Sequence, residues 1–494
     1  MAFIDGMVVN VALPTLQQAL GATAAEVQWV VESYALTLAS LLLLGGALGD
    51  KLGRRRVFSA GVAVFAGGSL ACALAPGIRW LVLARAVQGL GGALLIPGSL
   101  ALIGACIPAG RRGRAIGRWS AFSAAAAGVG PVLGGWLVQE FSWRAIFWLN
   151  LPIAAVNLII TLRHVPESRD PRAGRLDLPG AALATFALGA LVFGLLEAPR
   201  LGFEHPLILG ALVAGILMLA LLILVEARSP APMVPLDLFR SRSFSGANLL
   251  TLLLYAALGG AIYFLPFNLI QVHGYSPPQA GAALLPFIVL MLTLSGWAGH
   301  LVDRYGSRGP LIAGPLIAAL GFGLLALPGT GGSYWTTFFP AITVLGFGMT
   351  VTVAPLTTTV MGSVGPERAG LASGINNAVS RTASLLSIAV FGLAAYGRFG
   401  RSLMQRLDEL GVPPEIRQQL ARERRKLAAA SLPASLPDDL RRAVKAAIDS
   451  AFVDAFRLVM LLAAGLAVGG AVCAWWLIEA RRHGPRSSSK PPQG

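Results

Sequence analysis

The chain has 494 residues, of which 55% are hydrophobic and 13% are charged, whereas an ordinary soluble domain carries about 25% charged residues. So few charges cannot cover the surface of a soluble protein of this length, and we expect lipid to surround most of the chain. The formal net charge of +16 does not indicate a nucleic-acid partner, because the basic residues fall in short loops between apolar runs, as in a membrane protein.

The apolar runs predict an all-α polytopic membrane protein with about 14 transmembrane helices, since a spanning helix needs about 20 mostly apolar residues. In chain order, the predicted helices cover residues 1–18, 27–48, 57–75, 79–107, 117–138, 145–163, 178–197, 206–225, 245–270, 278–301, 310–327, 334–360, 369–396 and 452–478. Lys and Arg gather in alternate loops, and placing those loops in the cytoplasm puts both termini inside. The long polar segment 398–450 then lies outside as a small helical cap, unless the helix count is off by one.

Three ionisable residues lie nearest the predicted membrane interior, namely Asp5, Glu32 and Arg85. Charges at that depth are costly and usually face a cavity or a partner. Asp5 is the first candidate for a proton carrier, with a structural partner of Arg85 as its alternative role. Glu32 could bind a cationic cargo or a proton, or lie wet near the outer rim. Arg85 is better suited to tune a carboxylate than to bind an anionic cargo.

The first predicted helix starts abruptly. Asp5 lies four residues after Met1, so this helix lacks an apolar lead-in. We expect either a start further upstream or a truncated chain.

A charged loop framed by glycines follows the second predicted helix and recurs in the second half of the chain. The first copy contains Gly46, Asp50, Gly53, Arg54, Arg55 and Arg56, and the second contains Asp303 and Arg304. This recurrence indicates an internal duplication, which is typical of transporters. Opposite charges at helix ends can bridge in one conformation and separate in the other, so we predict a conformational gate. A topology anchor is the alternative role.

The fifth predicted helix carries several glycines around one proline. These residues are Gly128, Gly130, Pro131, Gly134 and Gly135. Proline removes a backbone hydrogen bond and kinks a helix, and glycine lets a neighbouring helix approach closely. We therefore expect a kinked helix that packs tightly.

Polar residues also interrupt two helices of the second half. Asn268 and Gln271 follow an aromatic stripe of Tyr263, Phe264 and Phe267, for which packing is the more common role. Their amides favour a cavity wall at this position. Asn376, Asn377 and Arg381 form a second group, which could line a cavity or form interhelical hydrogen bonds.

Several motifs resemble those of the major facilitator superfamily, and of its fourteen-helix drug:proton antiporters in particular. The similar segments are Asp5–Pro14, Gly46–Arg56, Leu83–Gly91, Gly128–Gly135, Trp143–Pro152 and Gly374–Ala378. Three positions depart from the family pattern: Met7 replaces a usual threonine, Glu32 replaces a small polar residue, and Arg308 alone remains of the second basic cluster. The motifs identify the family and name no substrate.

The resemblance implies two pseudo-symmetric six-helix bundles with two extra central helices. The expected units are residues 1–165, the linker helices in 166–243, the second bundle in 244–480 including 398–450, and a disordered cytoplasmic tail at 481–494. The glycine-rich helix would also seal the closed state against leak.

The resemblance further implies a proton-coupled antiporter that exports small lipophilic or cationic compounds across the cytoplasmic membrane of a bacterium. A narrow-specificity, proton-linked metabolite or nutrient transporter of the same superfamily is the alternative. We expect a monomer with no enzyme activity, no metal and no cofactor. The sequence has no phosphate loop ending in Gly-Lys-Ser/Thr, so the proton gradient is the expected energy source.

Overall fold

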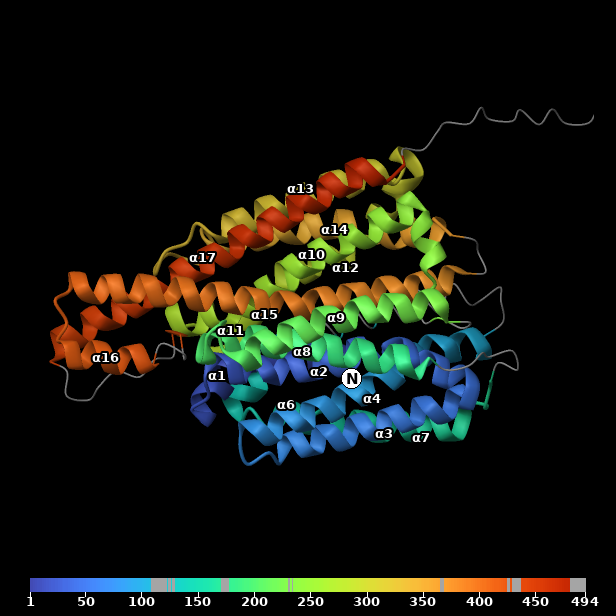
Figure 1. The fold of residues 1–494 in the computed structure, drawn as a ribbon, viewed down its shortest axis with the longest axis horizontal. Coiled ribbons are helices and arrows are strands. Elements are labelled where there is room, and N and C mark those ends of the chain that lie inside the picture. The colour runs from blue at the N-terminus through green and yellow to red at the C-terminus, as the bar shows by residue number, and fades with distance from the viewer. Residues whose placement is uncertain are drawn as a thin grey trace, which may run out of the picture.

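The computed structural model describes the chain except for residues 108–121, 123–125, 127–128, 170–176, 230–231, 233, 365–367, 424–426, 429–436 and 480–494. All regular elements of the described part are helices, and most of them run along one long axis (Figure 1). The prediction of an all-α protein is therefore confirmed. The predicted tail at 481–494 lies outside the described residues.

Helices of the first half pack closely through glycine. They are α1 (Ala2–Leu20), α2 (Ala24–Leu52), α3 (Arg54–Ala73), α4 (Ile78–Cys106), α6 (Ala145–Trp148) and α7 (Asn150–His164), with a further helical stretch at residues 129–140. α4 contacts both α2 and α3. A Cβ atom built on Gly45 would lie 2.1 Å from the Ala93 carbonyl oxygen, and one on Gly91 would lie 2.4 Å from the Phe65 nitrogen. Only glycine permits such close backbones.

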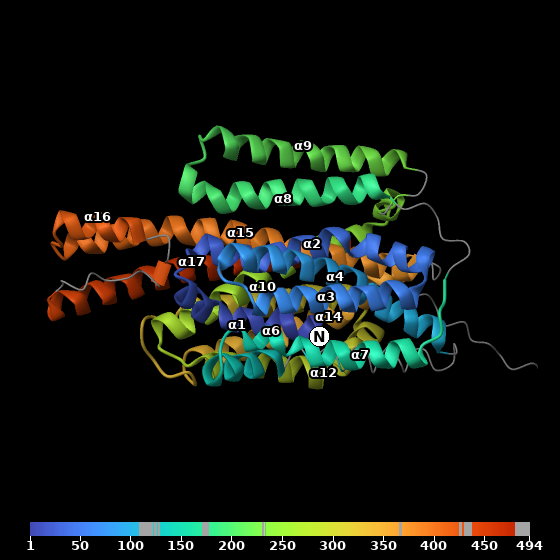
Figure 2. The ribbon, with the colours of Figure 1, turned by 90° about the horizontal axis from the view of Figure 1, so that it is seen from below.

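Two helices between the halves form a hairpin on one side of the bundle (Figure 2). They are α8 (Leu178–Leu201) and α9 (Pro206–Arg228), where the sequence predicts two extra helices. α8 packs on α2 and α15 (Ala369–Glu409), whereas α9 packs mainly on α8. Many exposed side chains of α9 are leucine, isoleucine and valine, as a lipid-facing surface requires.

The second half repeats the helical pattern and adds longer elements. They are η1 (Leu236–Arg240), α10 (Arg242–Phe267), η2 (Asn268–Val272), α11 (Pro277–Ala282), α12 (Leu285–Tyr305), α13 (Arg308–Leu325), α14 (Phe338–Gly362), α15, α16 (Pro414–Glu423) and α17 (Asp438–Leu477). The predicted helix at 245–270 continues past Phe267 as a π-helix, η2. Pro266 cannot donate a backbone hydrogen bond, which explains the irregular geometry here.

α15 and α17 are much longer than the predicted helices at 369–396 and 452–478. They contain 41 and 40 residues, so each is about 60 Å long at 1.5 Å per residue, against about 30 Å of hydrocarbon. The extended ends of α15 and α17, together with α16, form the polar segment 398–450, which projects from one end of the molecule (Figure 1, left). Phe399, Leu403, Leu407 and Leu420 are fully buried in this projection. The segment is therefore a packed helical cap, as its helical stretches predict.

Twelve helices of the described part are long and apolar enough to cross a membrane. The remaining two predicted spans are 1–18, which forms α1, and 117–138, of which residues 129–138 are helical and ten residues lie outside the described set. The halves meet where α1 contacts α10 and α11, and where α2 contacts α15.

Candidate functional site

A buried ion pair joins α1 to α4. Arg85 Nη1 donates a hydrogen bond of 2.5 Å to Asp5 Oδ2, and the two residues are 1% and 2% exposed. Arg85 Nε donates to the Val30 carbonyl oxygen at 3.1 Å, and the guanidinium carbon lies 4.2 Å from the centre of the Tyr34 ring. The structure thus brings together two of the three predicted ionisable residues. Asp5 is here the structural partner of Arg85, which is the alternative role that the sequence allows for it.

Amides complete a network around the Asp5 carboxylate. Gln88 Nε2 and Asn150 Nδ2 donate to Asp5 Oδ1 at 2.9 and 3.0 Å. The same two amides donate to Ser69 Oγ at 2.6 and 3.1 Å, and Gln88 Oε1 accepts from Arg85 Nη1 at 2.6 Å. The network therefore ties together α1, α3, α4 and α7, and both oxygens of the Asp5 carboxylate accept hydrogen bonds within it. Asn150 Oδ1 has no partner among the described residues.

Glu32 is also fully buried, but its environment is different. It is 0% exposed, and neither carboxylate oxygen has a hydrogen-bond partner among the described residues. It lies close enough to Tyr263 on α10 for the two groups to interact electrostatically. Glu32 therefore lies where the two halves meet, so the wet location near the outer rim that the sequence allowed is wrong.

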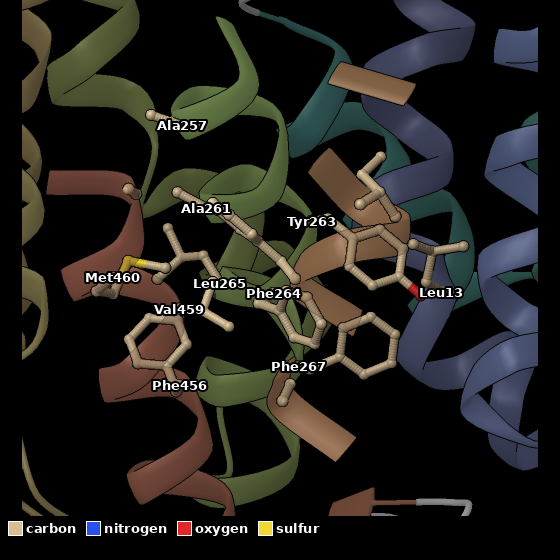
Figure 3. Close-up of a cluster of buried hydrophobic side chains, with 14 of the residues drawn as sticks. Leu13, Ala257, Ala261, Tyr263, Phe264, Leu265, Phe267, Phe456, Val459 and Met460 are labelled. Atoms are coloured by element: carbon tan, nitrogen blue, oxygen red, sulfur yellow. The ribbon is translucent and has the colours of Figure 1, made fainter. Parts of the chain in front are cut away.

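The aromatic stripe of α10 is part of the hydrophobic core. Tyr263, Phe264 and Phe267 are each at most 5% exposed (Figure 3). In that figure the Tyr263 hydroxyl points toward Leu13 on α1. The packing role that is more common for such stripes is confirmed.

The amides that follow this stripe lie at the junction of the halves. Gln271 Nε2 donates to Gln17 Oε1 on α1 at 3.0 Å. Asn268 is 2% exposed, and its Oδ1 has no partner within the described structure.

The three predicted polar residues of α15 have different surroundings. Asn376 Nδ2 donates to Thr251 Oγ1 at 2.7 Å and to Asn248 Oδ1 at 3.1 Å, so it forms the interhelical hydrogen bonds that the sequence allows. Asn377 is exposed and donates to the Ser373 carbonyl oxygen at 3.0 Å on its own helix. Arg381 is partly buried and lies near Tyr34 and Tyr255.

The first charged loop is held within its own half. Arg54 Nη2 lies 2.8 Å from Oδ1 of Asp50, which is one helical turn earlier. The Glu167 carboxylate accepts hydrogen bonds from the backbone nitrogens of Arg55 and Arg56 at 3.0 and 3.2 Å and caps the start of α3. Gly53 has a positive φ of 112°, and a Cβ there would lie 2.7 Å from Glu167 Oε1. Glycine is therefore required at this position.

The remaining gate residues have fewer described contacts. Gly46 packs near Pro97, with 3.6 Å between its ideal Cβ and the proline Cβ. In the second loop, Arg304 is exposed and lies 5.3 Å from the centre of the Tyr305 ring. The side chain of Asp303 lies outside the described set. The gating role stays a prediction.

Glycines of the fifth predicted helix allow it to touch both halves. Ideal Cβ atoms on Gly130 and Gly134 would lie 2.9 Å from Met7 Cβ and 2.7 Å from Val8 Cγ1 on α1. One on Gly135 would lie 2.4 Å from the Pro277 carbonyl oxygen of α11. The expected tight packing is confirmed.

The same contact is reciprocated from α11. A Cβ on Gly281 would lie 2.1 Å from the Pro131 carbonyl oxygen. Gly128 is outside the described residues. A seal against leak stays a prediction.

Sequence reasoning missed five residues that complete these contacts, namely Gln17, Ser69, Gln88, Asn150 and Glu167. Gln88 and Asn150 lie inside the family-like motifs, and a polar residue in an apolar run is itself a signal. Glu167 has no such signal, because it lies in a polar loop. The described residues include no group of three or more His, Cys, Asp or Glu side chains that could hold a metal ion.

Comparisons with known proteins agree with this architecture. A family model described as Major Facilitator Superfamily matches residues 1–388. The multidrug resistance protein Stp of Mycobacterium tuberculosis is 38% identical over 422 residues, which cover 85% of this chain and 78% of the relative. The tetracenomycin C resistance and export protein of Streptomyces glaucescens is 34% identical over 415 residues, with 84% and 77% covered.

A solved structure shares the fold. A bacterial homologue of the human lysosomal transporter Spinster, in an inward-facing and unoccupied conformation, superposes with a TM-score of 0.62. The two chains are 17% identical, and the match covers 95% of this chain and 94% of that one.

Proposed function

The chain belongs to the major facilitator superfamily, and from this premise we propose that it is a proton-coupled exporter of small lipophilic or cationic compounds. It works as a monomer in the cytoplasmic membrane of a bacterium, with 14 spanning helices and both termini in the cytoplasm. Relatives named for drug resistance and export support this activity.

The observation that carries the proposal is the buried carboxylate of Glu32, which has no hydrogen-bond partner in the described part of the chain. An ionised carboxylate without donors is costly in a dry interior, so Glu32 holds a proton in this conformation. When the halves move apart at this point, water reaches the side chain and the proton leaves. Proton uptake on one side of the membrane and release on the other is the chemistry that coupling requires.

Asp5 has the complementary task of a fixed counter-ion. Arg85, Gln88 and Asn150 all donate to its carboxylate, so its ionised form is well satisfied. These donors favour Glu32 over Asp5 as the proton carrier, although Asp5 is the first candidate from the sequence alone. Arg85 then tunes Asp5 and does not bind cargo.

Transport proceeds by rocking of the two halves about their junction, where cargo binds. The Asp50 and Arg54–Arg56 loop and its counterpart at Asp303 and Arg304 act as gates between the states. The halves are residues 1–165 and 244–480, and the segment 166–243 links them.

Dye accumulation in pump-deficient bacteria tests the proposal. Cells that express the chain should exclude ethidium, a lipophilic cation, until a protonophore is added. Glu32→Gln keeps the size of the side chain but cannot release a proton, so it should abolish exclusion. Glu26→Gln is the matched control, because Glu26 lies on the same helix, is partly exposed and forms only a capping box with Thr23.

Equal ethidium accumulation with and without a well-expressed chain would contradict export of lipophilic cations. Exclusion that survives the protonophore would contradict proton coupling. Exclusion that survives Glu32→Gln would remove Glu32 from the carrier role.

A further inference from the structure

Arg381 holds a positive charge in the middle of a membrane helix and has no partner among the described residues. It lies 12 residues after the start of α15 at Ala369, about 18 Å along the helix axis. Its guanidinium has no hydrogen bond or ion pair with any described residue, and the side chain is intermediate in exposure. Charges at this depth usually pair with one another or face a water-filled cavity. Part of the Arg381 side chain is accordingly open to solvent-sized molecules.

Helix packing does not account for this arginine. α15 is attached to α10 by the Asn376 amide, and by Ser384 Oγ, which donates to the Tyr255 carbonyl oxygen at 3.2 Å. A Cβ on Gly259 would lie 2.8 Å from Ser384 Cα, so the two backbones touch one turn beyond Arg381. These contacts fix the position of α15 without using the guanidinium.

The helices around Arg381 show that it lies at the junction of the two halves. α15 contacts α2 of the first half and α10 of the second half, and Arg381 lies near Tyr34 and Tyr255 on these two helices. Asn377, one turn earlier on the same helix, is exposed. Arg85, which is buried inside the membrane-spanning part, is already neutralised by Asp5. The charge of Arg381 is thus available to a molecule that enters the junction.

We infer that Arg381 binds an acidic group on the cargo, such as a carboxylate or an ionised phenol on an otherwise lipophilic molecule. A guanidinium donates paired hydrogen bonds to a carboxylate, and these bonds are strong where water is excluded. The inference rests on the proposed export function and narrows its cargo toward lipophilic acids and zwitterions. Arg381 is then the residue that discriminates among cargoes.

Two dyes that differ by one ester test this assignment. Rhodamine 110 has a free carboxylate, and rhodamine 123 is its methyl ester. Their affinities for the purified chain in lipid nanodiscs can be compared by fluorescence anisotropy at neutral pH. We expect rhodamine 110 to bind about tenfold more tightly, as one charge-assisted contact provides. Arg381→Gln should remove this preference, and Arg381→Lys should keep part of it.

Arg401→Gln is the matched control, since Arg401 lies on the same helix, is exposed and contacts the Gly397 carbonyl oxygen. It should leave the dye preference unchanged. Each variant should elute as wild type from a sizing column before its affinities are compared. A wild-type affinity ratio near one, a ratio that Arg381→Gln does not change, or binding of neither dye would overturn the inference. Ethidium exclusion tests the export function separately, because it needs no acidic group.

Discussion

A double-mutant cycle on Asp5 and Arg85 tests whether their ion pair holds the first half together. Asp5→Asn removes one charge and leaves the guanidinium of Arg85, which is 1% exposed, without an anion. Arg85→Gln leaves the Asp5 carboxylate with only the amides of Gln88 and Asn150. Removing one partner of a buried pair costs about 3–5 kcal/mol, because the other charge stays buried.

The double variant Asp5→Asn/Arg85→Gln removes both charges and keeps polar groups that can bond to one another. It should therefore lose much less stability than the sum of the single variants. We expect a coupling free energy of at least about 3 kcal/mol between the two positions. The free energy of unfolding can be measured for all four chains by titration with a denaturing detergent in mixed micelles.

An exposed ion pair supplies the control for this cycle. Arg200 and Glu197 are 2.7 Å apart, with side chains 54% and 18% exposed, and they should couple by less than about 1 kcal/mol. Coupling between Asp5 and Arg85 as weak as in this control would show that the ion pair does not hold the first half together. A single variant as stable as the unmodified chain would show the same.

Three further variants test individual contacts. Gly53→Ala places a Cβ 2.7 Å from Glu167 Oε1 at a φ of 112°, and it should lower the free energy of unfolding by about 1–3 kcal/mol. A fully stable Gly53→Ala chain would contradict the need for glycine. Gly281→Ala should separate α11 from the Pro131 carbonyl oxygen. In a chain without its native cysteines, a cysteine introduced nearby should then react with maleimide more readily. Unchanged labelling would argue against a seal at this contact. Asn376→Ala loses two interhelical hydrogen bonds and should cost about 1–3 kcal/mol in the same unfolding assay, whereas a loss below about 0.5 kcal/mol would show that these bonds are weak.

Hydropathy predicts helices well where lipid surrounds them, and poorly where water does. The predicted helix at 369–396 ends where α15 becomes polar, yet the helix continues to Glu409 because Phe399 and Leu403 pack into the cap. An apolar-run criterion measures burial in lipid and cannot detect a helix that is stabilised by protein contacts alone. For the same reason, the predicted helix at 452–478 misses the start of α17, which begins at Asp438.

Side-chain partners were harder to predict than helices. The sequence identifies Asp5 and Arg85 as interior charges, and their possible pairing follows from simple electrostatics. It does not show that Ser69 and Asn150 join them, because 81 residues separate these two in the chain. Contacts between distant positions depend on how the helices rotate and pack, which periodicity alone does not determine.

Asp5 and Glu32 show why two buried carboxylates can have different tasks. Protonation of Asp5 would leave Arg85 uncompensated and weaken a network that ties four helices together. Protonation of Glu32 breaks no described contact, because its oxygens have none to lose. A proton carrier must change charge on every cycle while the bundle around it stays folded. Glu32 meets this condition in the present structure, whereas Asp5 can meet it only if Arg85 finds another anion at the same moment.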